Sequence, residues 1–136
     1  MFDSIVVSPR VHEAVGGLVL LTTLLSLVWF GWRALKNRAP GKAGNLILMV
    51  TQAVLMVQVL IGVKLLDQGL GIMQIYVHYI GGLAPLAFFL VWYWLPERRR
   101  QGRWLGTVLT AGVFLFAVMT FFIGQSYVAS GSGFGA

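Results

Sequence analysis

The chain has no cysteine and little charge. Of its 136 residues only 10% are charged, whereas 58% are hydrophobic. An ordinary soluble domain carries about 25% charged residues, so this chain has too few polar groups to cover a water-facing surface. Without cysteine it can form neither a disulfide nor a thiolate metal site, and it has no cysteine nucleophile. The composition therefore predicts an integral membrane protein.

Acidic residues are scarcer still. The chain has 4 of them against 10 basic residues. They lie at the edges of the apolar segments and form no pair within any motif: Asp3, Glu13, Asp67 and Glu97. We therefore expect no hydrolytic site and no dinuclear metal cluster, and there is no glycine-rich phosphate loop. The basic residues lie in short loops between apolar spans, so we expect no nucleic-acid partner.

Four apolar segments are each near or above the ~20 residues that a helix needs to cross a bilayer. They must be helical, because backbone polar groups in lipid have to be paired within the segment. Ser8 and Pro9 offer an N-cap and a first-turn proline for the first helix. The short loops favour one all-α, four-helix transmembrane domain over residues 1–136 with an up-down-up-down arrangement. The predicted spans cover about residues 11–35, 45–66, 73–95 and 104–128, followed by a flexible tail at 129–136.

Basic residues are concentrated on one side of these spans. The opposite side has only Arg10 and Lys64, beside three acidic residues. The loops after the first and third spans carry eight: Arg33, Lys36, Arg38, Lys42, Arg98, Arg99, Arg100 and Arg103. Because positively charged loops stay in the cytoplasm, both termini and the turn at 67–71 are predicted to be extracytoplasmic. All five tryptophans fall near the cytoplasmic ends, as an interfacial aromatic belt would.

The two histidines are the candidate site. His12 lies near the outer start of the first span and His78 near the outer start of the third. In a square up-down bundle these helices are diagonal neighbours, so the imidazoles can face each other across the bundle axis at similar depth. An ionisable residue within a membrane span is a functional-site hypothesis by default. Two facing imidazoles predict the axial ligands of one haem, and bis-histidine ligation favours electron transfer over oxygen chemistry.

Glycines and cations surround the predicted pair. Gly16 and Gly82 each follow a histidine by four residues, one helical turn deeper on the same face. Gly62 and Gly124 lie near the outer ends of the second and fourth spans. Four glycines at one level would leave room for a flat cofactor, or would only pack helices closely. The predicted partners of haem propionates are Arg10 and Lys64, and the predicted hydrogen-bonding residues nearby are Gln58, Gln74, Tyr76, Tyr79 and Gln125.

Three features resemble one four-helix half of the haem A synthase family: a histidine that opens a helix, a later Gln58-x-x-x-Gly62, and the run HYIGGLAPL from His78. That family has two such bundles, each with a histidine pair for a b-type haem near the outer face. The resemblance covers all four spans and matches His12 and His78 to one pair. The family's Glu-x-x-His-Arg motif and its second bundle are absent here. The resemblance thus implies a small b-type cytochrome, or a bundle that pairs with another chain, rather than haem A synthesis.

The sequence therefore predicts a b-type cytochrome of a prokaryotic cell membrane, with one haem b toward the extracytoplasmic side. It would pass electrons between quinol and an external acceptor, or serve as the haem subunit of a larger complex or homo-oligomer. One alternative is a cofactor-free accessory or assembly subunit, whose glycines pack helices and whose basic loops bind lipid or a partner. Another is a chlorophyll-type pigment protein with one histidine ligand.

Overall fold

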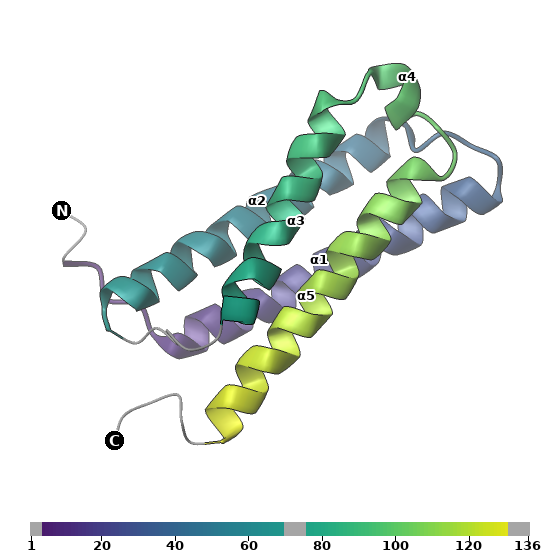
Figure 1. Cartoon of the computed structure of the whole chain (residues 1–136). Helices are drawn as coiled ribbons and strands as arrows, with labels where there is room; N and C mark the ends of the chain where they lie inside the picture. The colour runs from purple at the N-terminus through teal and green to yellow at the C-terminus, as the bar shows by residue number, and fades with distance from the viewer. Residues whose placement is uncertain (1–3, 70–75, 131–136) are drawn as a thin grey trace.

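The computed structural model describes residues 4–69 and 76–130, and in these residues it is helical (Figure 1). The four long helices are long and apolar enough to cross a membrane, which confirms the predicted all-α chain with four apolar spans. A single short helix lies between the last two. The helices are α1 (Pro9–Leu35), α2 (Gly41–Asp67), α3 (Tyr76–Trp94), α4 (Glu97–Arg100) and α5 (Leu105–Ala129).

The start of α1 follows the sequence closely. Ser8 is the N-cap, and its hydroxyl accepts a hydrogen bond from the Arg10 backbone N–H at 3.3 Å. Pro9 opens the helix, where its missing N–H costs nothing. The predicted cap is therefore confirmed, and it fixes where the first turn of α1, including His12, begins.

Other boundaries differ from the prediction. α2 begins at Gly41 rather than at residue 45, because Asn37 and Gly41 both take positive φ angles (54° and 70°) and complete the turn quickly. α4 forms one helical turn where only a polar loop was predicted. Ala129, assigned to the tail, is the last residue of α5. The predicted start of the third span at 73, Asp3, Gln74 and the tail beyond 130 lie outside the described residues.

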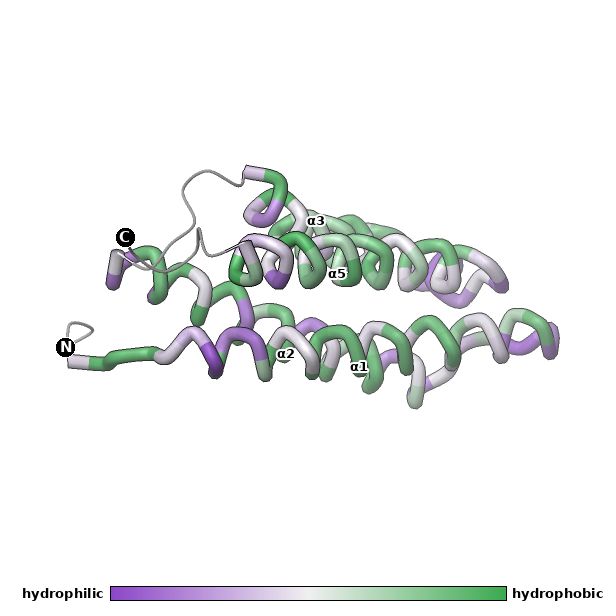
Figure 2. Tube along the Cα trace, turned by 90° about the horizontal axis from the view of Figure 1, so that it is seen from below, coloured by the Kyte–Doolittle hydropathy of each residue, from purple (hydrophilic) through white to green (hydrophobic). Residues whose placement is uncertain are grey.

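The four long helices pack unequally. α1 lies along both α2 and α5, and α5 also lies along α3, whereas α2 and α3 touch only sparsely. Figure 2 shows the result as two layers, with the α3–α5 pair lying over the α1–α2 pair. α1 and α3 are thus diagonal to each other, and any contact between their side chains has to cross the centre of the bundle.

The bundle interior holds a narrow core, while much of the apolar surface faces outward. The core includes Phe30, Phe89, Trp92 and Val113, each 1–2% exposed. Exposed leucines and valines occur along all four long helices. A surface of this kind suits a lipid bilayer rather than water, because lipid tails are as apolar as leucine. The structure therefore supports an integral membrane protein in contact with lipid.

The end of the bundle near α4 is closely packed. The Phe30 ring lies against Gly106 and meets Trp92 edge-on, with ring centroids 6.1 Å apart. The guanidinium of Arg103 donates from Nε to the Ala34 carbonyl at 2.8 Å, so it binds the carboxyl end of α1. These contacts leave the opposite end as the place where the four helices enclose space.

Candidate cofactor site

α1 and α3 begin, and α2 and α5 finish, at the same end of the bundle (Figure 1). Residues of all four long helices line a cavity of about 750 Å³ there. This volume is typical of small-molecule and cofactor sites, which span ~300–1,000 Å³. Apolar side chains line its deeper part, including Val19, Leu55 and Ala117. Polar side chains gather nearer its mouth. Each of the four long helices therefore contributes one wall of the site.

Both histidines line this cavity and face each other across it. The ring centroids of His12 and His78 are 6.1 Å apart, and the ring planes are inclined at 61°. A nitrogen ligand sits ~2.0 Å from a transition metal, so two imidazoles on opposite sides of one metal place their ring centres about 6 Å apart. Rings on a shared axis can rotate about it, so the inclination is compatible with that arrangement. The spacing fits two axial ligands.

The backbone orients the ring of His78. Its Nδ1 lies 3.1 Å from the Thr120 carbonyl oxygen on α5. A carbonyl only accepts, so Nδ1 carries the proton and Nε2 keeps its lone pair. The Tyr79 ring packs edge-on against the imidazole, with centroids 5.9 Å apart. A metal-binding histidine almost always donates its other ring N–H to such an acceptor, which fixes the tautomer.

The ring of His12 has a side-chain neighbour instead. The Gln58 amide nitrogen on α2 lies 3.4 Å from His12 Nε2. Five buried side-chain polar atoms have no hydrogen-bond partner among the described residues, and three of them are His12 Nδ1, Gln58 Oε1 and Thr120 Oγ1. All three residues line the cavity. An unpaired buried polar atom costs roughly 1–3 kcal/mol, so this concentration at one site points to a ligand that the protein is built to hold.

The four predicted glycines all line the cavity, but they differ in what they face. A Cβ on Gly62 would lie 3.3 Å from His12 Cε1, and one on Gly124 would lie 3.1 Å from His78 Cε1. A Cβ on Gly16 would meet the Gln58 amide and the Phe121 ring at 3.2–3.3 Å, and only Gly82 faces open space. Three of the four glycines thus make room for side chains rather than for an empty slot, in contrast to the sequence expectation.

The two predicted cations have separate positions. Arg10 is exposed and lines the mouth of the cavity, near Glu13 and Gln125, whose side chains contact each other at 3.4 Å. Lys64 is not among the residues that line the cavity, and it forms an ion pair with Asp67 on its own helix. The structure therefore brings Arg10, but not Lys64, to the histidines.

Sequence reasoning missed two contributors from α5, Thr120 and Phe121. The Thr120 carbonyl is a backbone group, and no sequence pattern identifies its role. Phe121 reads as an ordinary apolar residue until the helix rotation is known. Among the described residues no three histidine or carboxylate side chains gather as a metal site. A haem needs only two axial ligands from the protein, because the macrocycle supplies the other four nitrogens.

Comparison of the chain with family models, with curated proteins and with solved structures finds no match.

Proposed function

We propose that this chain is a membrane b-type cytochrome that holds one haem b between His12 and His78. The observation that supports it best is the pair of imidazoles, 6.1 Å apart, that α1 and α3 present inside a cavity of about 750 Å³. Haem would supply one-electron chemistry. The protein's contribution would be two fixed axial ligands, an apolar wall and restricted access for water.

Different residues of the cavity would orient the two imidazoles and bind the haem propionates. The Thr120 carbonyl holds the ring of His78 with Nε2 available, whereas Gln58 lies against Nε2 of His12 and would leave Nδ1 of that ring as the ligating nitrogen. Gln58 carries both a donor and an acceptor, so it can orient either tautomer of the imidazole. Arg10 at the mouth is the cation placed to meet carboxylates such as the haem propionates. Two axial ligands leave iron no open position, which favours electron transfer.

The charge pattern sets the proposed orientation. The helices would alternate in direction across the bilayer, with the loops at 36–40 and 95–104 in the cytoplasm and both termini outside. The histidine cavity would then lie toward the extracytoplasmic side of a prokaryotic cell membrane. From there it would carry electrons between quinol and an external acceptor, or serve as the haem subunit of a larger complex, as the resemblance to a haem A synthase half also suggests.

A second candidate is a cofactor-free accessory subunit. It is favoured by glycines that serve close packing alone: Gly81 lies against the Thr120 side chain, and Gly106 against Phe30. Such contacts let helices approach without any cofactor. This candidate leaves the unpartnered polar atoms of His12, Gln58 and Thr120 without a purpose, so we rank it below the cytochrome.

The test is a reduced-minus-oxidised absorption spectrum of the detergent-purified protein, with pyridine extraction to identify the haem. We expect a b-type difference spectrum, one haem per chain and a low-spin bis-imidazole electron paramagnetic resonance signal. Replacing either histidine (His12→Ala or His78→Ala) should abolish haem retention. Lys64→Gln, outside the cavity, is the matched control and should retain it. A protein that stays colourless after haem is supplied, or a pigment that ignores reductant, would contradict the proposal.

A further inference from the structure

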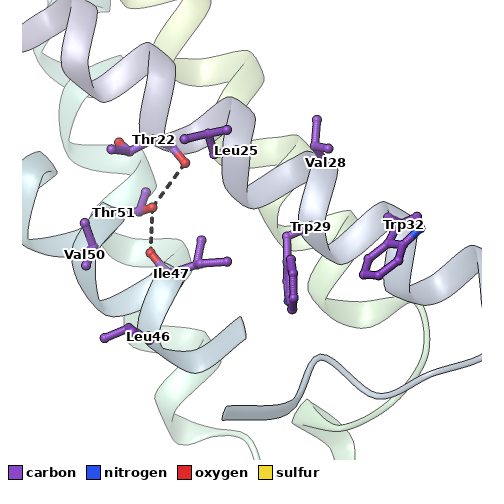
Figure 3. Close-up of a pocket in the computed structure, with 9 residues that line it drawn as sticks. All are labelled: Thr22, Leu25, Val28, Trp29, Trp32, Leu46, Ile47, Val50 and Thr51. Carbon is purple, nitrogen blue, oxygen red and sulfur yellow. Dashed lines mark hydrogen bonds between the residues drawn. The ribbon is translucent and has the colours of Figure 1, made fainter. Parts of the chain in front are cut away.

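A second concave site lies between α1 and α2, in the other half of the bundle (Figure 3). It is a groove of about 450 Å³ that is open along its side. Its walls are almost wholly apolar, and Figure 3 shows two tryptophans of α1 at one end of it. The lining residues are Thr22, Leu25, Val28, Trp29, Trp32, Leu46, Ile47, Val50 and Thr51.

The few polar groups of this groove are already bonded. The Thr51 hydroxyl donates to the Ile47 carbonyl at 2.9 Å, and the Thr22 hydroxyl donates to the Leu18 carbonyl at 3.0 Å. The indole N–H of Trp29 donates to the Pro40 carbonyl at 3.3 Å. A ligand with buried carbonyl groups, such as a quinone ring, would find these donors occupied. A hydrocarbon chain needs none of them.

The length of the groove suits such a chain. Thr22 and Trp32 lie ten residues apart on α1, which is about 15 Å at 1.5 Å per residue. Half of a ~30 Å hydrocarbon core is about the same distance. The groove therefore runs along roughly one leaflet of the bilayer, from near its middle to the end of α1.

The polar end of the groove carries unpaired positive charge. Lys36 follows Trp32 by four residues, and Lys42 precedes Leu46 by four, so each lysine extends one wall of the groove by a turn. Both lysines are exposed, and no described carboxylate lies within ion-pair distance of them. Arg33 is held in place nearby, with Nε donating to the Ala39 carbonyl at 2.7 Å and the guanidinium over Trp29. A basic site between membrane helices complements an anionic lipid headgroup.

We propose that this groove binds one anionic phospholipid, with an acyl chain along Leu25, Val28 and Val50 and the phosphate beside Lys36 and Lys42. The chain would fill apolar space that is closed on the bundle side, and the two ammonium groups would select the negative headgroup. This site is separate from the histidine cavity, and it does not depend on whether that cavity holds haem.

The test compares phosphatidylglycerol with phosphatidylcholine of the same acyl chains, added to the delipidated full-length protein and followed by native mass spectrometry. We expect phosphatidylglycerol to bind at least about tenfold more tightly, as two added charge contacts imply. Lys36→Gln with Lys42→Gln should remove that preference. Arg98→Gln with Arg99→Gln removes the same charge from two exposed residues of α4, away from the groove, and should leave the preference unchanged.

A groove-filling variant tests the apolar part separately. Val50→Trp should lower phosphatidylglycerol binding at least about tenfold, because the indole occupies the path of the acyl chain. Val91→Trp places the same side chain on an exposed position of α3 that lines neither cavity, and it should bind lipid like the wild type. The proposal would be overturned if the two lipids bound equally, or if a short-chain quinone displaced the lipid. It would also be overturned if the Val50→Trp variant bound phosphatidylglycerol as the wild type does, or if the double lysine variant kept its preference for that lipid.

Discussion

The two ends of the bundle differ in where their unpartnered buried polar atoms lie. At the histidine end, His12 Nδ1, Gln58 Oε1 and Thr120 Oγ1 are buried without partners around one cavity. At the basic end, Arg100 Nε and Thr107 Oγ1 are also buried without partners among the described residues, but they line neither concave site. Nearer the middle of the bundle, the Ser26 and Thr51 hydroxyls bond each other at 2.8 Å and link α1 to α2. Satisfied groups stabilise the fold, whereas unsatisfied ones cost free energy that a bound ligand can recover. What distinguishes the histidine end is that its unpartnered atoms gather around one cavity, and this clustering favours a ligand there.

Glycines at the two ends also differ in what they contact. Near the basic end, Gly44 makes room for the Pro40 and Phe30 rings, and Gly106 makes room for Phe30. These glycines serve helix packing. At the histidine end, Gly62 and Gly124 make room for the imidazoles themselves. Gly62 and Gly124 therefore contact the candidate ligands directly, whereas Gly16 and Gly81 at the same end pack against Phe121 and Thr120.

Among these variants, the largest loss of haem should come from filling the space that Gly124 leaves for the His78 imidazole. Gly124→Val places a branched side chain where even a Cβ would lie 3.1 Å from His78 Cε1 and 3.4 Å from its Nδ1. The ring would have to leave the Thr120 carbonyl, so we expect at least about a tenfold loss of haem retention. The measurement is the haem-to-protein ratio of the purified variant.

Gly82→Ala is the control for that substitution. It also adds a side chain to a cavity glycine, but its Cβ would meet nothing within 4 Å. We expect near wild-type haem content, because one methyl group takes little of a cavity of about 750 Å³. If both variants kept their haem, the position of the His78 imidazole would not depend on the space that Gly124 leaves for it. Gly124 would then have no special role at the histidine end.

A smaller effect should come from the neighbour of His12. Gln58→Glu puts a carboxylate beside His12, which would raise the basicity of this proposed ligand and favour the oxidised iron. We expect the midpoint potential to fall by up to roughly 60 mV, the equivalent of a tenfold change for a one-electron couple. Spectroelectrochemical titration measures it.

Gln125→Glu is the matched control for that charge. Gln125 also lines the cavity, but it is exposed at the mouth and contacts Glu13 rather than either imidazole. The midpoint potential should shift less in this variant, because solvent screens an exposed charge. Equal shifts in the two variants would mean that only the added charge matters and that Gln58 does not orient His12.

The sequence predicts the helices well because apolar length alone decides whether a segment can span the bilayer. It also predicts that His12 and His78 share one end, since each follows the start of a helix by a few residues. It could not assign Gly62 to His12 or Gly124 to His78. Those pairings require the rotation of each helix, which depends on packing against neighbours distant in the chain.

The error at Lys64 has a similar physical origin. The residue lies two positions after Gly62, which suggested that it would share the cavity. Two residues correspond to about 200° around a helix, however, so the side chain points away from the face of Gly62. There it meets Asp67, three residues later and on the same face. The spacing along the chain does not by itself give the direction of a side chain around the helix axis.

The smallest effect should come from the hydroxyl that links α1 to α2. Thr51→Val keeps the shape of the side chain and removes the hydroxyl that lies 2.8 Å from Ser26 Oγ and 3.3 Å from the Thr22 carbonyl of α1. The Ser26 hydroxyl can then donate to the Thr22 carbonyl, 2.8 Å away. We expect a loss of about 0.6 kcal/mol in the free energy of unfolding, the average for hydrogen bonds between membrane helices. Unfolding by steric trapping in detergent or bicelles measures it.

Thr110→Val tests whether the loss in the free energy of unfolding at Thr51 comes from the link between the helices. The Thr110 hydroxyl is buried to the same extent, but it donates only to the Gly106 and Thr107 carbonyls of its own helix, at 2.8 and 3.1 Å. Helices persist when a membrane protein unfolds within the bilayer, so this bond exists in both states and its loss should cost less than that of Thr51. An equal or larger cost at Thr110 would show that burial of the hydroxyl, rather than the link between helices, sets the stability near the basic end.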